Sequence, residues 1–234
     1  MDIIAQALRE AIGLLLSGDP ATMRVAGLSL AVSGAATGLA ALVGVPLGAW
    51  LAIWRGWGLR VLVSLLNTGM ALPPVVVGLF LALLFWRSGP LGGLDVMYTP
   101  LAMVIAQWIV AAPIAAGLTR AACLSVEPEI VEALRLDGAS EWRVVRELVA
   151  IARAPVLVAI AAAFGRAIAE VGASLMVGGN ILNQTRILTT AVALDVGRGE
   201  FARALALGLL LLFLALLVNS ALGWPVARQR ERGG

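Results

Sequence analysis

Two charged side chains, Arg166 and Glu170, stand four residues apart within a long apolar stretch of the sequence. Ionisable groups within membrane helices are rare and usually face the interior of a helix bundle. On a continuous helix this spacing would place both on one face, where they can pair. Two interpretations stay open: a structural ion pair that fixes helix packing, or an arginine that supplies positive potential to an anion path.

Small and neutral polar residues accompany this pair. Gly172, Gly178 and Gly179 allow close helix packing or a break in the helix, and hydroxyl and amide side chains lie around them. Such neutral hydrogen-bonding groups suit transient contact with a tetrahedral oxyanion, because they contact it without trapping it. The candidate translocation path consists of Arg166, Glu170, Ser174, Asn180, Thr189 and Thr190.

The side chains that most enzymes use are missing. The sequence has no histidine, no lysine and a single cysteine, Cys123, which excludes imidazole catalysis, a thiolate metal cluster and a phosphate-binding loop with its lysine. We therefore expect no catalytic residue, no metal site and no cofactor, and any ATP that drives the protein must be bound by another chain. The basic residues are all arginines without interleaved aromatic residues, so we expect no nucleic-acid binding.

The composition indicates a membrane protein. Hydrophobic residues make up 61% of the 234 residues and charged residues 13%, whereas soluble domains have about 45–50% and about 25%. That excess is too large for one buried core, so most of the chain must face lipid or other membrane helices. The predicted fold class is an all-α integral membrane protein.

Five segments are long and apolar enough to cross a hydrocarbon layer of about 30 Å, which takes about 20 helical residues. They lie near residues 25–53, 61–86, 96–119, 155–177 and 204–224. Pro73 and Pro74 fall inside the second segment, so we expect it to be kinked, with its middle inside the bundle. Gly34 and Gly38 in the first segment have a spacing that permits close helix approach.

The first 20 residues form a separate segment, with Ile4, Leu8, Ile12 and Leu15 on one helical face. We predict an amphipathic helix over 1–20, either lying in the membrane interface or packed on the bundle. The transmembrane domain then extends over 21–226, with a polar loop at 120–154, and residues 227–234 form a basic cytoplasmic tail.

Arginines are distributed unevenly between the two sides that five spans would create. The 54–60 turn, the 120–154 loop and the C-terminus share one side, which carries more arginines than the other. Arginine-rich loops stay in the cytoplasm. The sequence therefore predicts a multi-pass protein of the cell inner (plasma) membrane, with an external N-terminus and a cytoplasmic C-terminus.

The 120–154 loop reads as two short helices joined at a glycine turn. Pro128 suits the first turn of a helix, with Glu127 and Glu129 favourable at its positive end. Gly138 can adopt the left-handed conformation that ends a helix, and Ser140 can cap the next one. Such a rigid helix, presented by two membrane helices, is suited to docking in a groove of a cytoplasmic partner.

Glu132-Ala133 followed by Gly138 and then a membrane helix resembles the EAA signature of ABC importer permeases. The block over 164–191 resembles the permeases of tungstate uptake systems, and molybdate and sulfate permeases share a looser form of it. The resemblance implies that the loop is a coupling helix held in a cleft of the ATP-binding subunit. Its coupling residues would be Val131, Glu132, Ala133, Leu134, Gly138 and Ala139.

The same resemblance implies a type I ABC importer permease fold and a homodimer in membrane lipid. The partners would be an ATPase dimer and an extracytoplasmic solute-binding protein. The expected function is import of a tetrahedral oxyanion, tungstate, with molybdate or sulfate as alternatives of the same shape and charge. A stand-alone secondary transporter and a scaffold without transport are the competing classes. The odd number of spans argues against the former, and the glycine-turn loop against the latter.

Overall fold

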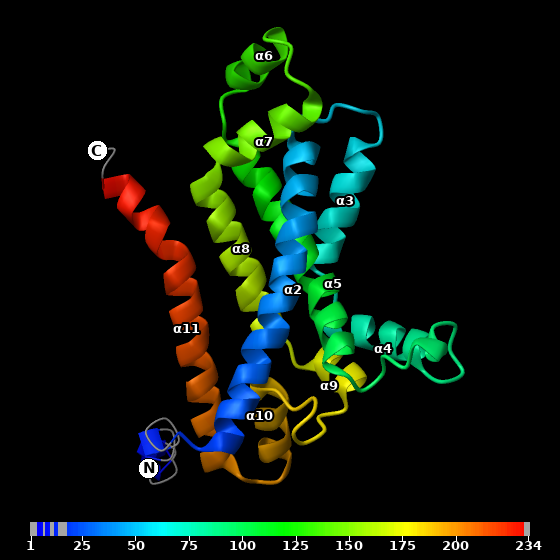
Figure 1. Ribbon diagram of the computed structural model, residues 1–234, viewed down its shortest axis with the longest axis vertical. Helices are drawn as coiled ribbons and strands as arrows, with labels where there is room; N and C mark the ends of the chain where they lie inside the picture. The colour runs from blue at the N-terminus through cyan, green and yellow to red at the C-terminus, as the bar shows by residue number, and fades with distance from the viewer. Residues whose placement is uncertain (1–3, 7, 10–11, 14–17, 232–234) are drawn as a thin grey trace. The chain divides into compact units, whose positions relative to one another are not determined.

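The computed structural model describes residues 4–6, 8–9, 12–13 and 18–231, and every regular element in that part of the chain is helical. This confirms the predicted all-α class. Half of the predicted amphipathic helix over 1–20 lies outside the described residues; residues 4–6, 8–9 and 12–13 are helical, and Ile4, Leu8 and Ile12 are exposed. The elements, labelled in Figure 1, are α2 (Pro20–Ile53), α3 (Leu59–Met70), α4 (Pro74–Phe85), η1 (Gly92–Leu94), α5 (Pro100–Leu124), α6 (Pro128–Leu136), α7 (Glu141–Ile151), α8 (Arg153–Ile168), α9 (Gly172–Gly178), α10 (Leu188–Gly197) and α11 (Phe201–Glu231).

Three helices, α2, α5 and α11, are each long and apolar enough to cross a membrane. They confirm the first, third and fifth predicted spans. The start of α2 is fixed by Asp19, whose carboxylate accepts hydrogen bonds from the Thr22 hydroxyl at 2.7 Å and the Thr22 N–H at 2.9 Å. These two bonds, the hydroxyl bond first, lower the pKa of Asp19.

The second predicted span is broken at its prolines. Helices α3 and α4 meet at an angle of 96°, with Pro73 in an extended conformation before α4 and Pro74 in the first turn of α4. A proline disfavours the helical conformation of the residue before it and lacks the N–H that a continuing helix needs. The predicted kink is thereby confirmed, but the middle of the segment is not buried within this chain, where Ala71 and Pro73 are exposed.

The fourth predicted span, over 155–177, is not one helix. Helix α8 ends at Ile168, and α9 begins at Gly172 after a short break. Helix α8 instead follows α7 directly, at an angle of 83°, and this bent pair is the other candidate span. Pro155 is tolerated near the start of α8 because N–H groups in the first turn have no helical partner.

The chain divides into two compact units, each built from separate stretches of sequence. Unit 1 comprises Met1–Ala36, Pro73–Gln107 and Ala167–Val218. Unit 2 comprises Thr37–Leu72, Trp108–Arg166 and Asn219–Gly234.

Unit 2 is held by a close approach of α2 and α5. A Cβ at Gly44 would lie 2.9 Å from Ala115 Cβ, and one at Gly48 would overlap the carbonyl of Ala116. Small residues at such contacts let helix backbones pack tightly in lipid. By contrast, nothing lies within 4 Å of a Cβ built at Gly34 or Gly38. The close approach of α2 to α5 therefore occurs at Gly44 and Gly48, and not at the predicted Gly34 and Gly38.

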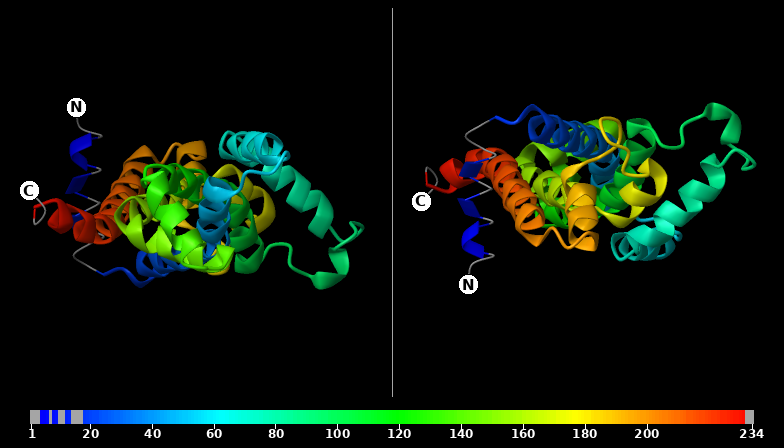
Figure 2. Two further views of the ribbon diagram at one scale, coloured as in Figure 1. Left: turned by 90° about the horizontal axis from the view of Figure 1, so that it is seen from above. Right: turned by 90° about the horizontal axis from the view of Figure 1, so that it is seen from below.

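Unit 1 has a second tight contact, between α4 and α9. A Cβ at Gly78 would lie 2.7 Å from Ala173 Cα, and one at Gly172 would lie 2.8 Å from Val75 Cγ2. In Figure 2, the chain can be traced by its colour from α4 (cyan-green) through the turn that follows it to α5 (green). Elsewhere in unit 1, a buried apolar cluster joins α2, α10 and α11 through Ala26, Leu188, Ala191, Leu207 and Leu210.

Candidate functional site

The 120–154 loop folds into α6 and α7, two short helices joined by a glycine turn, as predicted. Pro128 occupies the first turn of α6. Gly138 has φ +78°, and its N–H donates to the carbonyl of Arg135 at 3.0 Å. The N–H of Ala139 donates to the carbonyl of Leu134, also at 3.0 Å. This pair of bonds closes the helix end and needs the left-handed conformation that glycine adopts readily.

The start of α7 is fixed by its own cap and by a bridge to α6. The Ser140 hydroxyl accepts a hydrogen bond from the N–H of Arg143 at 3.4 Å. The guanidinium of Arg135 donates two hydrogen bonds to the Glu141 carboxylate, each at 3.0 Å. Because both side chains are partly exposed, this pair adds little stability, but its two-point geometry orients α6 against α7.

The inner face of the loop is anchored to the membrane helices of unit 2. Val131, Leu134 and Ala139 pack against a buried cluster from α2, α5, α7 and α8. The cluster consists of Ala49, Ile53, Ala122, Cys123, Val144, Val145, Leu148, Ala152 and Val156. The loop is therefore packed directly onto the ends of membrane helices.

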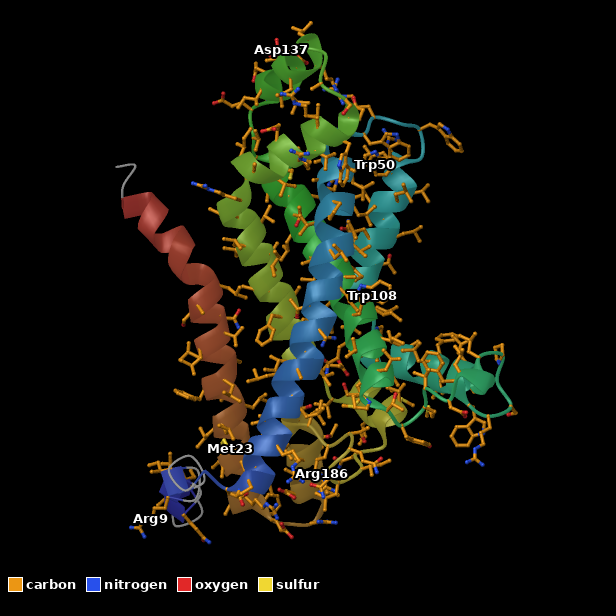
Figure 3. The ribbon with its side chains drawn as sticks, viewed as in Figure 1. Arg9, Met23, Trp50, Trp108, Asp137 and Arg186 are labelled. Atoms are coloured by element: carbon orange, nitrogen blue, oxygen red, sulfur yellow. The ribbon has the colours of Figure 1, made fainter. Side chains whose placement is uncertain are left out.

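The outer face of α6 is exposed. Ala133 lies on it, Leu136 is 88% exposed, and Trp142 at the start of α7 is 60% exposed. Glu132 is exposed too, but it also lines a pocket of about 140 Å³ together with Ile53 and Cys123. Figure 3 labels Asp137, the residue that ends α6. Sequence reasoning missed Leu136 and Trp142, although large apolar residues in a polar loop were an available signal.

Glu170 lies in the break between α8 and α9. Its Oε1 atom accepts a hydrogen bond from the N–H of Ala173 at 2.8 Å, and its carbonyl accepts one from the Thr189 hydroxyl at 3.0 Å. Arg166 lies in the last turn of α8 and is half-buried. The expectation that Arg166 and Glu170 share one continuous helix is therefore wrong. The Glu170 carboxylate caps α9 in the place where the helix is interrupted.

A buried chain of polar side chains joins three helices of unit 1. The Ser33 hydroxyl of α2 donates to Gln107 Oε1 at 2.9 Å, and Gln107 Nε2 of α5 donates to the Ser174 hydroxyl of α9 at 3.1 Å. All three side chains are at most 1% exposed. The N–H of Tyr98 also donates to the carbonyl of Val177 at 2.8 Å. Helix α9 is thus fixed along its length by hydrogen bonds.

The turn between α9 and α10 is held by its own polar groups. Asn180 has φ +51°, and its side-chain and backbone oxygens accept hydrogen bonds from the Arg186 guanidinium at 3.2 and 3.3 Å. The Asn180 amide donates to the carbonyl of Thr190 at 3.3 Å. The Thr185 hydroxyl donates to the carbonyl of Gly178 and accepts from the N–H of Ile181. Figure 3 labels Arg186 in this turn.

The structure thus gives most of the candidate path residues partners within the chain. Those buried in unit 1 are Glu170, Ser174, Thr189 and Thr190, whereas Arg166 and Asn180 are half-buried. Gln107 and Arg186 contact members of this set and were missed, although a lone glutamine in an apolar span was a visible signal. A role for these residues in translocation stays a prediction. In the part of the chain that the structure describes, no three His, Cys, Asp or Glu side chains are placed to hold a metal ion.

A solved transport protein shares this fold. The structure described as inward-facing conformations of the MetNI methionine ABC transporter matches with a TM-score of 0.68. The match covers 87% of this chain and 95% of that chain at 20% identity. The two chains therefore share the same arrangement of helices. This chain belongs to the family of binding-protein-dependent transport system inner membrane components, whose model matches residues 44–231.

Relatives of known type are similar over almost the whole chain. The tungstate uptake system permease protein TupB of Peptoclostridium acidaminophilum is 37% identical over 95% of this chain and 97% of its own length. A probable anion ABC transporter permease protein of Haloferax volcanii is 39% identical over 89% of this chain and 90% of its own length. The molybdenum transport system permease protein ModB of Escherichia coli K12 is 30% identical over 88% of this chain and 94% of its own length.

Proposed function

We propose that this chain is the membrane-spanning subunit of an ABC importer that moves a tetrahedral oxyanion, tungstate, into the cell. The observation that carries the proposal is the 37% identity to a tungstate permease over 95% of this chain. A second tungstate permease, from Campylobacter jejuni, is 32% identical over 94% of the chain. The molybdenum and sulfate permeases of Escherichia coli K12 are each 30% identical, over 88% and 84% of the chain.

ATP hydrolysis belongs to a partner chain in this proposal. The lack of lysine supports it, because a phosphate-binding loop needs one. The coupling surface consists of the exposed side chains of α6 and the start of α7, Glu132, Ala133, Leu136 and Trp142. The packing of the loop supports this assignment, because the other side of α6 and α7 packs against the ends of membrane helices. A displacement of the docked helix would be transmitted to the membrane segments.

Two further partners complete the assembly. A second copy of the chain would form the other half of the permease, and an extracytoplasmic solute-binding protein would deliver the oxyanion. The arginine distribution supports an orientation with the N-terminus outside and with α6, α7 and the C-terminus in the cytoplasm. In that orientation the exposed face of α6 is available to a cytoplasmic ATPase.

Uptake by cells tests the substrate. A strain that lacks this chain should lose high-affinity uptake of labelled tungstate, and restoring the chain should restore it. Unlabelled tungstate should compete more strongly than molybdate, and sulfate least. If molybdate competes more strongly than tungstate, the substrate assignment changes to molybdate while the permease assignment stands. Unchanged uptake of all three anions in the strain without the chain would contradict the proposed function.

A further inference from the structure

A pocket of about 450 Å³ lies beyond the C-terminal end of α4, within unit 1. Its walls come from the end of α4 and from residues 92–98. The N–H of Leu91 donates to the carbonyl of Leu84 at 2.9 Å, which folds the turn back onto the helix. Gly89 and Gly92 are needed here, because a Cβ at either would overlap a backbone carbonyl. The pocket is therefore built by a fixed turn.

Two opposite charges and two aromatic rings line this pocket. Arg87 and Asp95 are exposed, and among the described residues neither is ion-paired or hydrogen-bonded through its side chain. Trp86 and Tyr98 meet edge to face, with ring centroids 6.5 Å apart. Buried Phe85 forms an apolar part of the wall.

The backbone holds two of these side chains in an unusual conformation. Asp95 has φ +48° and Tyr98 has φ +62°. Positive φ is uncommon outside glycine, and for a bulky residue such as Tyr98 it is a genuine outlier. Conformations of this kind persist when the surrounding structure enforces them, and they gather at ligand sites. The hydrogen bond from the Tyr98 N–H to the carbonyl of Val177 helps to hold Tyr98 in this conformation.

The sequence around the pocket is of the kind found at the boundary between hydrocarbon and water. Residues 74–85 contain no polar side chain, and the first charge after them is Arg87. Leu91 and Leu94 are 41% and 63% exposed beside it. Tryptophan and tyrosine gather at the headgroup level of membranes, where one side of the ring is apolar and the other is wet. A ligand here meets lipid chains on one side and water on the other.

We propose that this pocket binds the headgroup of a phospholipid that carries a primary ammonium, phosphatidylethanolamine. Arg87 would hold its phosphate through charge-assisted hydrogen bonds. Asp95 would accept hydrogen bonds from the ammonium, which would also contact the faces of Trp86 and Tyr98. The inference does not rest on the proposed transport function.

Other ligands fit this combination less well. An anionic lipid such as phosphatidylglycerol leaves Asp95 without a cation and adds no partner for the aromatic rings. Phosphatidylcholine has a quaternary ammonium with no N–H to donate to the carboxylate. A free oxyanion would use Arg87 alone and be repelled by Asp95.

Lipid retention by the purified full-length protein tests the proposal. The protein in detergent micelles is mixed with equal amounts of phosphatidylethanolamine, phosphatidylglycerol and phosphatidylcholine, and bound lipid is counted by native mass spectrometry. We expect preferential retention of phosphatidylethanolamine, about tenfold weaker in Arg87→Gln and in Asp95→Asn. Asparagine tolerates the left-handed conformation, so Asp95→Asn preserves the turn. The control is Arg198→Gln, an exposed arginine of unit 1 outside this pocket, which should retain the wild-type amount.

Two results would overturn the proposal. One is equal retention of phosphatidylethanolamine by the wild type and both pocket variants. The other is equal retention of phosphatidylethanolamine and phosphatidylglycerol by the wild type, a comparison that needs no variant and stands even if a variant fails to fold.

Discussion

Gln107 connects two serines that lie far from it in the sequence and on different helices of unit 1. The sequence shows that such residues can donate and accept hydrogen bonds, but not which partner they take. Ser174, Thr189 and Thr190 were predicted as path donors for that reason. The structure gives Thr189 the carbonyl of Glu170 and Thr190 the carbonyl of Ile187 as acceptors. Partner choice depends on helix contacts that no local pattern encodes.

Replacing Gln107 with leucine should destabilise unit 1. The change removes both hydrogen bonds of the buried chain, and each such bond in a membrane is worth about 0.6 kcal/mol on average and up to about 1.7. We expect a loss of about 1–3 kcal/mol, measured as a lower midpoint of thermal unfolding in detergent. Gln184→Leu, the same change at an exposed position of the turn before α10, is the matched control. Equal midpoints for Gln107→Leu and the control would show that the buried chain contributes nothing.

Arg166 and Glu170 can be tested by removing both charges. Glu170 is buried and its carboxylate accepts the Ala173 N–H, so replacing Glu170 alone by an apolar residue should be costly. The double variant Arg166→Leu with Glu170→Gln removes both charges and keeps an oxygen to accept the Ala173 N–H. If Arg166 supports an anion path, this variant should fold but import oxyanion slowly. Wild-type uptake, normalised to folded protein, would leave the two residues with a structural role.

At the scale of elements, local signals were sufficient where local contacts decide the structure. Pro128, Gly138 and Ser140 predicted both ends of the turn between α6 and α7, and each residue acts through its own backbone. The position of the break after Ile168 was not predicted, because most of 155–177 is apolar and reads as one helix, with Gly172 as the only marked breaker directly beside it. It depends on a carboxylate that caps α9 and on a contact between Gly172 and α4. The sequence therefore predicts the existence of a membrane span more reliably than the position at which the span bends.

The coupling surface makes a prediction for α6. Gly138→Val should distort the turn, because valine is strained at φ +78°, and Glu132→Lys should reverse a charge at an exposed position of α6. Both variants should hydrolyse ATP in the complex but lose most of the coupled uptake in vesicles. Arg198→Gln serves as the control variant. Full coupled uptake by both α6 variants would contradict the coupling role.

For the whole molecule, composition predicted a helical membrane protein and the arginines predicted its orientation. The match of an inner-membrane transport family to residues 44–231 of this chain agrees with the first of these. The orientation can be measured with reporter fusions after Arg230 and within 92–95. We expect the former to report cytoplasm and the latter the outside. If the two fusions report the opposite sides, the predicted orientation is wrong and α6 lies outside the cell.

The central claim is that this chain imports an oxyanion only as part of an ATP-driven complex. Its direct test is reconstitution of the chain in liposomes with its ATPase and solute-binding protein, followed by measurement of labelled tungstate inside the vesicles. Accumulation should require ATP and should stop when either partner is omitted. Accumulation by the chain alone would identify a stand-alone transporter. No accumulation by a folded, complete complex would also contradict the account.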